Sequence, residues 1–306
     1  MKLHGFTWLI AGLLLMYPGS LAADKEPKVL VINSDARIEK YKVAQEEFTG
    51  TLSRPVRAIN LDDPKWKVAD VENLLYDEYP DLVYCIGSKA YFIANRFVSE
   101  KEIVFSSIVN WQRLPVTRKT YGVSVELHSG MQMTLFRYIF PQVKKIGVLY
   151  STKYNSEWFK NASAEAKEMG IEIVGKSISE SKETIDALKE ILPGIDVLWL
   201  IPDPLIMEDK ENLMKIFKAC EAQKLPVFSY HDSFIDYGAL LVVSVDEPTI
   251  GRQAAGIAVE ILSLGKIEEK VQYPAGSHII LNLKKVKEYG LQYKEEALSA
   301  VNQIVE

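Results

Sequence analysis

The sequence contains few cysteines and no surplus of basic charge. Only 2 of its 306 residues are cysteines, Cys85 and Cys220. Both stand in apolar or amphipathic stretches, so we expect two buried free thiols, with a disulfide between them as the alternative in an oxidising compartment. Lys and Arg total 36 against 41 Asp and Glu, for a formal net charge of −5. Because this balance argues against binding along a phosphate backbone, we expect no nucleic acid partner.

Motifs for cofactors, metals and nucleophilic catalysis are also missing. The chain has no Gly-x-x-x-x-Gly-Lys phosphate loop, no closely spaced Cys or His pair of a zinc site, and no Gly-x-Ser-x-Gly nucleophile turn. We therefore expect no cofactor, no metal and no enzymatic activity. A catalytic alternative stays open, in which an exported α/β enzyme uses His231 with Asp232 or Asp203.

The N-terminal segment has the three parts of a secretory signal peptide. A short positive start with Lys2 precedes an apolar stretch over residues 6–16, and small residues follow at Ser20 and Ala22. We expect a signal peptide over residues 1–22, with cleavage after Ala23 as a close alternative. A membrane anchor needs roughly 20 apolar residues, more than this stretch supplies. The mature protein is predicted to be periplasmic or extracytoplasmic, and monomeric.

The mature chain first alternates buried strands with helices. Apolar runs rich in β-branched residues are typical of strands that are buried on both faces of a parallel sheet. The pattern predicts strands over 28–33, 82–86 and 103–109, and helices over 39–52 and 89–99. This alternation indicates a doubly wound α/β lobe over residues 23–120, which we expect a segment near 247–270 to complete.

The same pattern then starts again. Predicted strands cover 120–125, 145–150, 171–177, 197–201, 226–230 and 239–245, and predicted helices cover 129–140, 156–169, 183–192, 210–223 and 250–264. A second lobe is therefore expected over 121–246, completed near 275–306. The predicted fold class is α/β, with two doubly wound Rossmann-like lobes and a central cleft. Open α/β sheets bind ligands beyond the carboxyl ends of their strands, so both lobes are expected to face one ligand.

Several short segments carry a resemblance to a known family. From about Tyr121 onward, the sequence resembles the substrate-binding proteins of ABC importers of the TrpX-like type, which have the periplasmic-binding-protein type I fold. The matching segments are 121–124 (Tyr-Gly-Val-Ser), 144–150 (Lys-Lys-Ile-Gly-Val-Leu-Tyr), 225–228 (Leu-Pro-Val-Phe), 238–240 (Gly-Ala-Leu), 251–255 (Gly-Arg-Gln-Ala-Ala), 281–284 (Leu-Asn-Leu-Lys) and 290–291 (Gly-Leu). Weaker matches precede them at 85–88 and 103–106.

The resemblance implies a protein that closes two lobes around a small ligand and delivers it to ABC permease subunits in the membrane. An amino acid or a similar small carboxylate is the expected ligand. The alternative is a sensor that passes ligand occupancy to a chemoreceptor or kinase. Three loops depart from the relatives, at 110–112 (Asn-Trp-Gln), 202–204 (Pro-Asp-Pro) and 229–232 (Ser-Tyr-His-Asp). The resemblance therefore indicates fold and role rather than ligand identity.

Candidate ligand contacts follow predicted strands in both lobes. In the first lobe, Ser88 is expected to cap a helix, contact an anionic group, or both, and Asn110 and Trp111 end a strand, where the indole offers either a flat apolar wall or core packing. The second-lobe candidates are Tyr150, Asn155, Ser156, Asp203, Tyr230 and Asp246. The resemblance suggests ligand contact for Asn155 and Ser156, although both also suit a helix cap.

Two further features of the second lobe complete the expectations. Asp203 lies between two prolines, so it is either a fixed carboxylate for a ligand amine or a solvent-facing turn residue. Trp158 and Trp199 are interpreted mainly as core residues.

Overall fold

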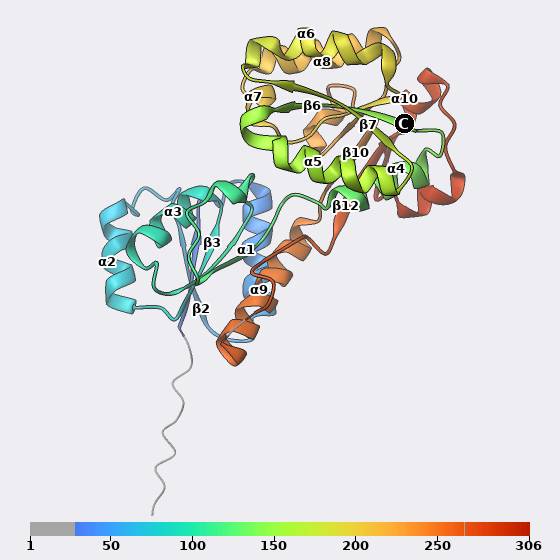
Figure 1. Cartoon of the computed structure of the whole chain (residues 1–306). Coiled ribbons are helices and arrows are strands. Elements are labelled where there is room, and N and C mark those ends of the chain that lie inside the picture. The colour runs from blue at the N-terminus through green and yellow to red at the C-terminus, as the bar shows by residue number, and fades with distance from the viewer. Residues whose placement is uncertain (1–27, 266) are drawn as a thin grey trace, which may run out of the picture.

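The computed structural model describes residues 28–265 and 267–306, and it shows two α/β lobes (Figure 1). In this part of the chain the strands form two sheets, of six and seven strands, which define lobe 1 and lobe 2. The predicted fold class is confirmed. The predicted signal peptide over 1–22 lies outside the described residues. Among the described helices, none combines the length and the apolar character that a membrane crossing requires.

Lobe 1 is built on the sheet with the strand order β11-β5-β4-β3-β1-β2, in which all paired strands are parallel. Every residue of β1 and β3 is buried, because helices cover both faces of the sheet. The strands are β1 (Val29–Asn33), β2 (Val56–Asn60), β3 (Leu82–Ile86), β4 (Glu102–Ser106), β5 (Thr120–Val123) and β11 (Val271–Gln272). The helices are α1 (Glu39–Thr51), α2 (Val68–Glu78), α3 (Ser88–Phe97), the 3₁₀ turn η1 (Trp111–Arg113) and α9 (Glu247–Leu264).

Lobe 2 is built on the sheet with the order β13-β12-β10-β9-β8-β6-β7, in which only the pair β10–β12 is antiparallel among the described strands. Its strands are β6 (Lys145–Ser151), β7 (Glu172–Ile178), β8 (Val197–Trp199), β9 (Val227–Ser229), β10 (Leu241–Val245), β12 (Ser277–Asn282) and β13 (Gln303–Val305). Its helices are α4 (Ser129–Ile139), α5 (Thr152–Glu168), α6 (Thr184–Ile191), α7 (Pro204–Met207), α8 (Lys210–Ala222) and α10 (Leu283–Tyr289). Short 3₁₀ turns complete it at η2 (Ser181–Glu183), η3 (Leu192–Gly194), η4 (Asp232–Ile235) and η5 (Glu295–Ala300).

The described chain passes between the lobes three times. These crossings join β5 to α4, β10 to α9, and β11 to β12. The second crossing returns the chain to lobe 1, where α9 packs along α1 (Figure 1). A Cβ atom at Gly251 of α9 would lie 2.5 Å from the carbonyl oxygen of Ala44, so only glycine permits this close packing of the two helices.

The structure changes several expected element bounds. The strand expected over 103–109 ends at Ser106, because Ser107 has a φ of 59°, in the left-handed region, and leaves the ladder. Helix α5 begins at Thr152, before its expected start at residue 156. The expectation of free thiols is confirmed, since Cys85 and Cys220 are both buried and unpaired. Burial raises the pKa of the Cys220 thiol to about 12, which keeps it protonated and unreactive.

Candidate ligand-binding site

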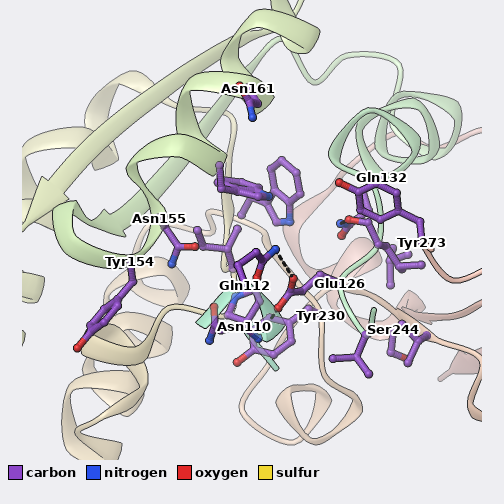
Figure 2. A pocket seen from close by; sticks show the side chains of 18 of the residues that line it. Asn110, Gln112, Glu126, Gln132, Tyr154, Asn155, Asn161, Tyr230, Ser244 and Tyr273 are labelled. Carbon is purple, nitrogen blue, oxygen red and sulfur yellow. Dashed lines mark hydrogen bonds between the residues drawn. The ribbon is translucent and has the colours of Figure 1, made fainter. Parts of the chain in front are cut away.

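A cavity of about 300 Å³ lies where the two lobes and the three crossings meet. This volume is at the lower end of the roughly 300–1,000 Å³ that is common for small-molecule sites. The aromatic side chains of the described residues that line it are Tyr154, Trp158, Trp199, Tyr230 and Tyr273. The neutral polar ones are Asn110, Gln112, Gln132, Asn155, Asn161 and Ser244 (Figure 2). The charged ones are Arg113, Glu126 and Glu157.

Lobe 2 supplies a rigid aromatic wall. Tyr154 and Trp158 stand four residues apart on α5, so the helix presents them on one face. The Trp158 ring meets Trp199 edge to face, with centroids 5.2 Å apart at 69°. Trp199 is 1% exposed and packs against Phe136 in the lobe 2 core. The interpretation of Trp158 and Trp199 as core residues is therefore incomplete, because the same rings also border the cavity.

A buried aspartate holds part of this wall in place. The Asp203 carboxylate accepts hydrogen bonds from the Ser151 backbone N–H (2.6 Å), the Ser151 hydroxyl (2.7 Å) and the Asn155 amide (2.7 Å). Its other oxygen accepts from the Leu205 N–H and so caps α7. Asp203 is 0% exposed and does not line the cavity, contrary to both sequence interpretations. The hydrogen bond from the Asn155 amide to Asp203 instead fixes the orientation of Asn155, and Asn155 lines the cavity.

Tyr230 follows β9 and closes another side of the cavity. Its ring packs edge to face against Phe234, with centroids 5.6 Å apart. Burial, with the Asp203 charge as a smaller contribution, raises the pKa of the Tyr230 phenol to about 12. The phenol is therefore neutral at physiological pH and carries a proton that it can donate to a ligand acceptor.

Lobe 1 reaches the cavity through one short loop after β4. Asn110 adopts the left-handed conformation with φ 54°, which turns the chain into η1. Gln112 and Arg113 of this turn then face lobe 2. The Arg113 guanidinium lies over the Tyr154 ring, 4.4 Å from its centroid, so a cation–π contact joins the lobes at the cavity.

Glu126 belongs to the first crossing and faces the cavity beside this loop. One carboxylate oxygen accepts the Asn110 backbone N–H at 2.5 Å. The other accepts the Gln112 side-chain amide at 3.2 Å (Figure 2). Burial raises the pKa of the Glu126 carboxyl, and these two hydrogen bonds oppose the rise. Among the described residues, Glu126 has no salt-bridge partner. The crossing thus carries a half-buried acid, and none of the described cations forms an ion pair with it.

The remaining predicted contacts lie outside the cavity lining. Ser88 is exposed at the start of α3, and the Trp111 ring packs against Phe105 at a centroid distance of 6.2 Å. Tyr150 stacks on Phe159 at 4.2 Å. The Ser156 hydroxyl donates to the Thr152 carbonyl, and Asp246 caps α9 by accepting the Thr249 N–H. Asn110, Asn155 and Tyr230 are thus the predicted residues that the structure brings together.

The catalytic pair proposed as an alternative is not assembled at the cavity. The His231 ring bonds Ser233 Oγ at 2.9 Å, within its own turn, and burial lowers the pKa of His231. Neither His231 nor Asp232 lines the cavity, and Asp203 is enclosed by its own hydrogen-bond donors.

Sequence comparison identifies the family. The family profile described as ABC transporter substrate binding protein matches residues 59–305. The chain belongs to this family. Membership confirms the predicted family, the predicted role as a substrate-binding protein of an ABC transporter and the prediction of a non-enzymatic protein.

Two proteins that are similar to this substrate binding protein have an aromatic amino acid as ligand. A tyrosine-binding protein of Clostridioides difficile is 26% identical over 191 residues, which are 60% of this chain and 54% of that protein. This chain therefore spans about half the length of that relative. An ABC domain of Streptococcus pneumonia in complex with L-Trp is 18% identical, with a TM-score of 0.58 over 91% of this chain and 100% of that one.

A second solved structure is the ligand-free, open form of a substrate binding protein with adhesive properties from Clostridium difficile. It is 19% identical, with a TM-score of 0.70 over 91% of this chain and 99% of that one. At these identities the two structures show that the fold is shared.

Proposed function

We propose that this substrate binding protein works outside the cytoplasmic membrane and delivers an aromatic amino acid to the permease subunits of an ABC importer. The observation that carries the ligand class is the aromatic lining of the cavity between the lobes. Trp158, Trp199 and Tyr230 offer ring faces and edges that match a planar side chain better than a sugar or a short aliphatic one. The polar groups needed to hold an amino acid backbone stand beside them.

The similar proteins support the same ligand class. One of them is called a tyrosine-binding protein, and another was solved with L-Trp bound. Their ligands share an aromatic ring with an amino acid backbone, which suits the mixture of rings, amides and carboxylates in this cavity. Asn110, Asn155 and Tyr230 are proposed as ligand contacts on this basis.

Closure of the lobes is the proposed signal to the permease. The proposed lobes comprise about residues 23–120 with 247–270, and 121–246 with 275–306. Three crossings beside one cavity suit a hinge, because a few residues in each absorb the change in backbone angles. The Arg113–Tyr154 contact already spans the cleft and guides the two faces together.

Calorimetric titration tests the proposed ligand. The protein is unfolded and refolded to remove any bound compound, then titrated with L-Tyr, L-Trp, L-Phe, L-Leu, L-Ala and ribose. We expect the three aromatic amino acids to bind about tenfold or more tightly than L-Leu, because the rings contribute contact area that an aliphatic chain lacks. Preferential binding of ribose, or of no compound in the series, contradicts the proposal. Loss of low-concentration uptake in a gene-deletion strain tests the delivery step.

A further inference from the structure

The charged groups of the cavity are unequal in burial and in partners. Among the described lining residues, Arg113 is the one cation, and its exposed guanidinium rests on the Tyr154 ring. Glu157 is exposed to solvent on α5. Glu126 is half-buried in the first crossing, and in the described chain no Lys, Arg or His nitrogen lies within 4.0 Å of its carboxylate. Within the described residues, the cavity therefore holds one half-buried negative charge without a counter-charge.

A carboxylate in this position has unused bonding capacity. An ionised carboxylate offers about four lone-pair sites. Asn110 N–H and the Gln112 amide each occupy a site on a different oxygen, so both oxygens keep room for a further donor. Both existing donors belong to lobe 1, and they hold the carboxylate in a fixed place in the crossing. A bound cation would find it already oriented.

We infer that Glu126 accepts the positively charged amino group of the ligand, so that the cavity selects aromatic ammonium compounds over their deaminated counterparts. This inference rests on the proposed function, because it concerns the same cavity. A primary ammonium has three donors and a full charge, which suits a half-buried carboxylate with free lone pairs. A deaminated analogue leaves that carboxylate unpaired and brings its own negative charge near it.

The rings around the cavity strengthen the same selection. Tyr273 lies in the third crossing and also lines the cavity. Burial raises the pKa of its phenol, and the negative charges of Glu165 and then Glu126 add to the rise. Aromatic faces attract cations through their quadrupole, whereas they do not attract carboxylates. An ammonium group near Glu126 is therefore favoured by the acid and by the adjacent ring together.

The experiment compares three ligands that share the aromatic ring. L-Phe carries both charged groups, 2-phenylethylamine lacks the carboxylate, and 3-phenylpropionate lacks the ammonium. With the wild-type protein we expect 3-phenylpropionate to bind roughly 30-fold or more weakly than L-Phe, as expected when a buried charge loses its partner. In Glu126→Gln, L-Phe binding is expected to weaken by a similar factor, while 3-phenylpropionate binding is unchanged or stronger.

Three variants separate recognition of charge from support of the loop. Glu168→Gln removes one exposed acid from α5 outside the cavity, and it controls for the change in net charge. Gln112→Ala removes one donor to Glu126 but leaves its charge, so the preference for L-Phe over 3-phenylpropionate is expected to persist. Glu126→Asp keeps the charge on a shorter side chain, and is expected to recover part of the preference. Thermal unfolding of each variant establishes that it is folded.

The outcomes distinguish the two claims. If wild type binds L-Phe and 3-phenylpropionate equally well, or if Glu126→Gln weakens both ligands alike, the role of Glu126 is wrong while the proposed function stands. The same conclusion follows if Gln112→Ala abolishes the preference. If the folded wild-type protein binds none of the three aromatic ligands, the proposed function fails, and the inference fails with it.

Discussion

The two sides of the cavity are built very differently. Lobe 2 presents rings that are anchored in its core, with Trp199 packed against Phe136 and Trp158 packed against Trp199. Lobe 1 presents one turn, which begins at Asn110 and is tied by two hydrogen bonds to Glu126 of the first crossing. We call the lobe 2 rings Trp158 and Trp199 the platform, and the lobe 1 turn that begins at Asn110 the arm.

This difference suggests how the work of binding is divided. A platform whose rings are fixed before the ligand arrives loses little side-chain entropy on binding, which favours affinity. A short arm attached to a crossing moves with lobe 1 when the hinge turns, which favours closure around a bound ligand. Variants of the two sides should therefore have different effects on stability and on binding.

The largest expected effect on stability comes from removing the Trp199 side chain, which supports Trp158 from the lobe 2 core. Trp199→Ala is expected to lower the free energy of unfolding by about 3–5 kcal/mol, because it leaves a cavity in the lobe 2 core. Hydrogen exchange measured by mass spectrometry is expected to accelerate in lobe 2 strands and much less in β1 and β3. Equal acceleration in both lobes would show that the lobes do not unfold as separate units. Trp199→Phe is the control, with a smaller loss.

The next effect concerns the buried carboxylate beneath the wall. Asp203→Asn places an amide N–H against hydrogen-bond donors such as Ser151 and Asn155, so we expect a loss of roughly 2–3 kcal/mol of unfolding free energy. Asp209→Asn is the matched control, because Asp209 caps α8 and asparagine caps a helix equally well. Urea unfolding measures both variants. Similar losses in the two would contradict the special placement of Asp203.

A pH effect is expected where α9 joins lobe 1. Burial, with the negative charges of Asp232 and Asp246, raises the pKa of Glu247 from 4.5 to about 7, while Lys40 opposes the rise. The folded protein then holds a proton that the unfolded chain has released. Stability from this group is full below about pH 4.5 and is lost as the pH rises toward about 7.

Glu247→Gln is therefore expected to raise the unfolding free energy at pH 8 by up to about 2 kcal/mol, and to flatten its dependence on pH between 4.5 and 7. Thermal unfolding across this range measures the effect. Glu39→Gln, which removes an exposed acid from α1, is the control. If Glu247→Gln unfolds with the same dependence on pH as the wild type, the Glu247 carboxyl of the wild-type protein is solvated and the expectation is wrong.

The smallest effect separates Trp158, which lines the cavity, from Trp111, which does not. Trp158→Ala is expected to weaken binding of an aromatic amino acid about tenfold, since its ring lines the cavity. Trp111→Ala is expected to change the affinity by less than about threefold, because Trp111 packs on Phe105 inside lobe 1. Calorimetry with L-Tyr compares them. A larger loss of affinity in Trp111→Ala than in Trp158→Ala would show that the lobe 1 turn, rather than the lobe 2 rings, supplies most of the ligand contact.

Much of the fold follows from sequence pattern alone. Continuous apolar runs such as 82–86 predict buried central strands, and the structure confirms them. Edge elements gave weaker signals: β2 has only Ile59 buried, so its run of Val-Arg-Ala-Ile-Asn does not read as a strand. The strand β11 has 2 residues and depends on pairing with β5, far away in the sequence.

The site was harder to predict than the fold. Asn110, Asn155 and Tyr230 were predicted because each stands just beyond a strand or at the start of the helix after it, where open α/β sheets bind ligands. Sequence pattern does not identify Trp158 as a cavity residue, because the side of α5 on which it lies depends on where that helix begins. Glu126 and Tyr273 stand in crossings, where no periodic pattern shows which way a side chain faces. The spacing of Tyr154 and Trp158 by four residues was the one signal in the sequence that both rings share a face of the helix.

Small-angle X-ray scattering during a titration tests most directly whether the two lobes close on an aromatic amino acid. The ligand-stripped protein is measured alone and with saturating L-Tyr or L-Trp, at concentrations that calorimetry shows to fill the cavity. We expect the radius of gyration to fall on binding, and we expect Glu126→Gln to require a higher ligand concentration to reach the same value. A bound, saturated protein whose radius of gyration does not change would contradict it.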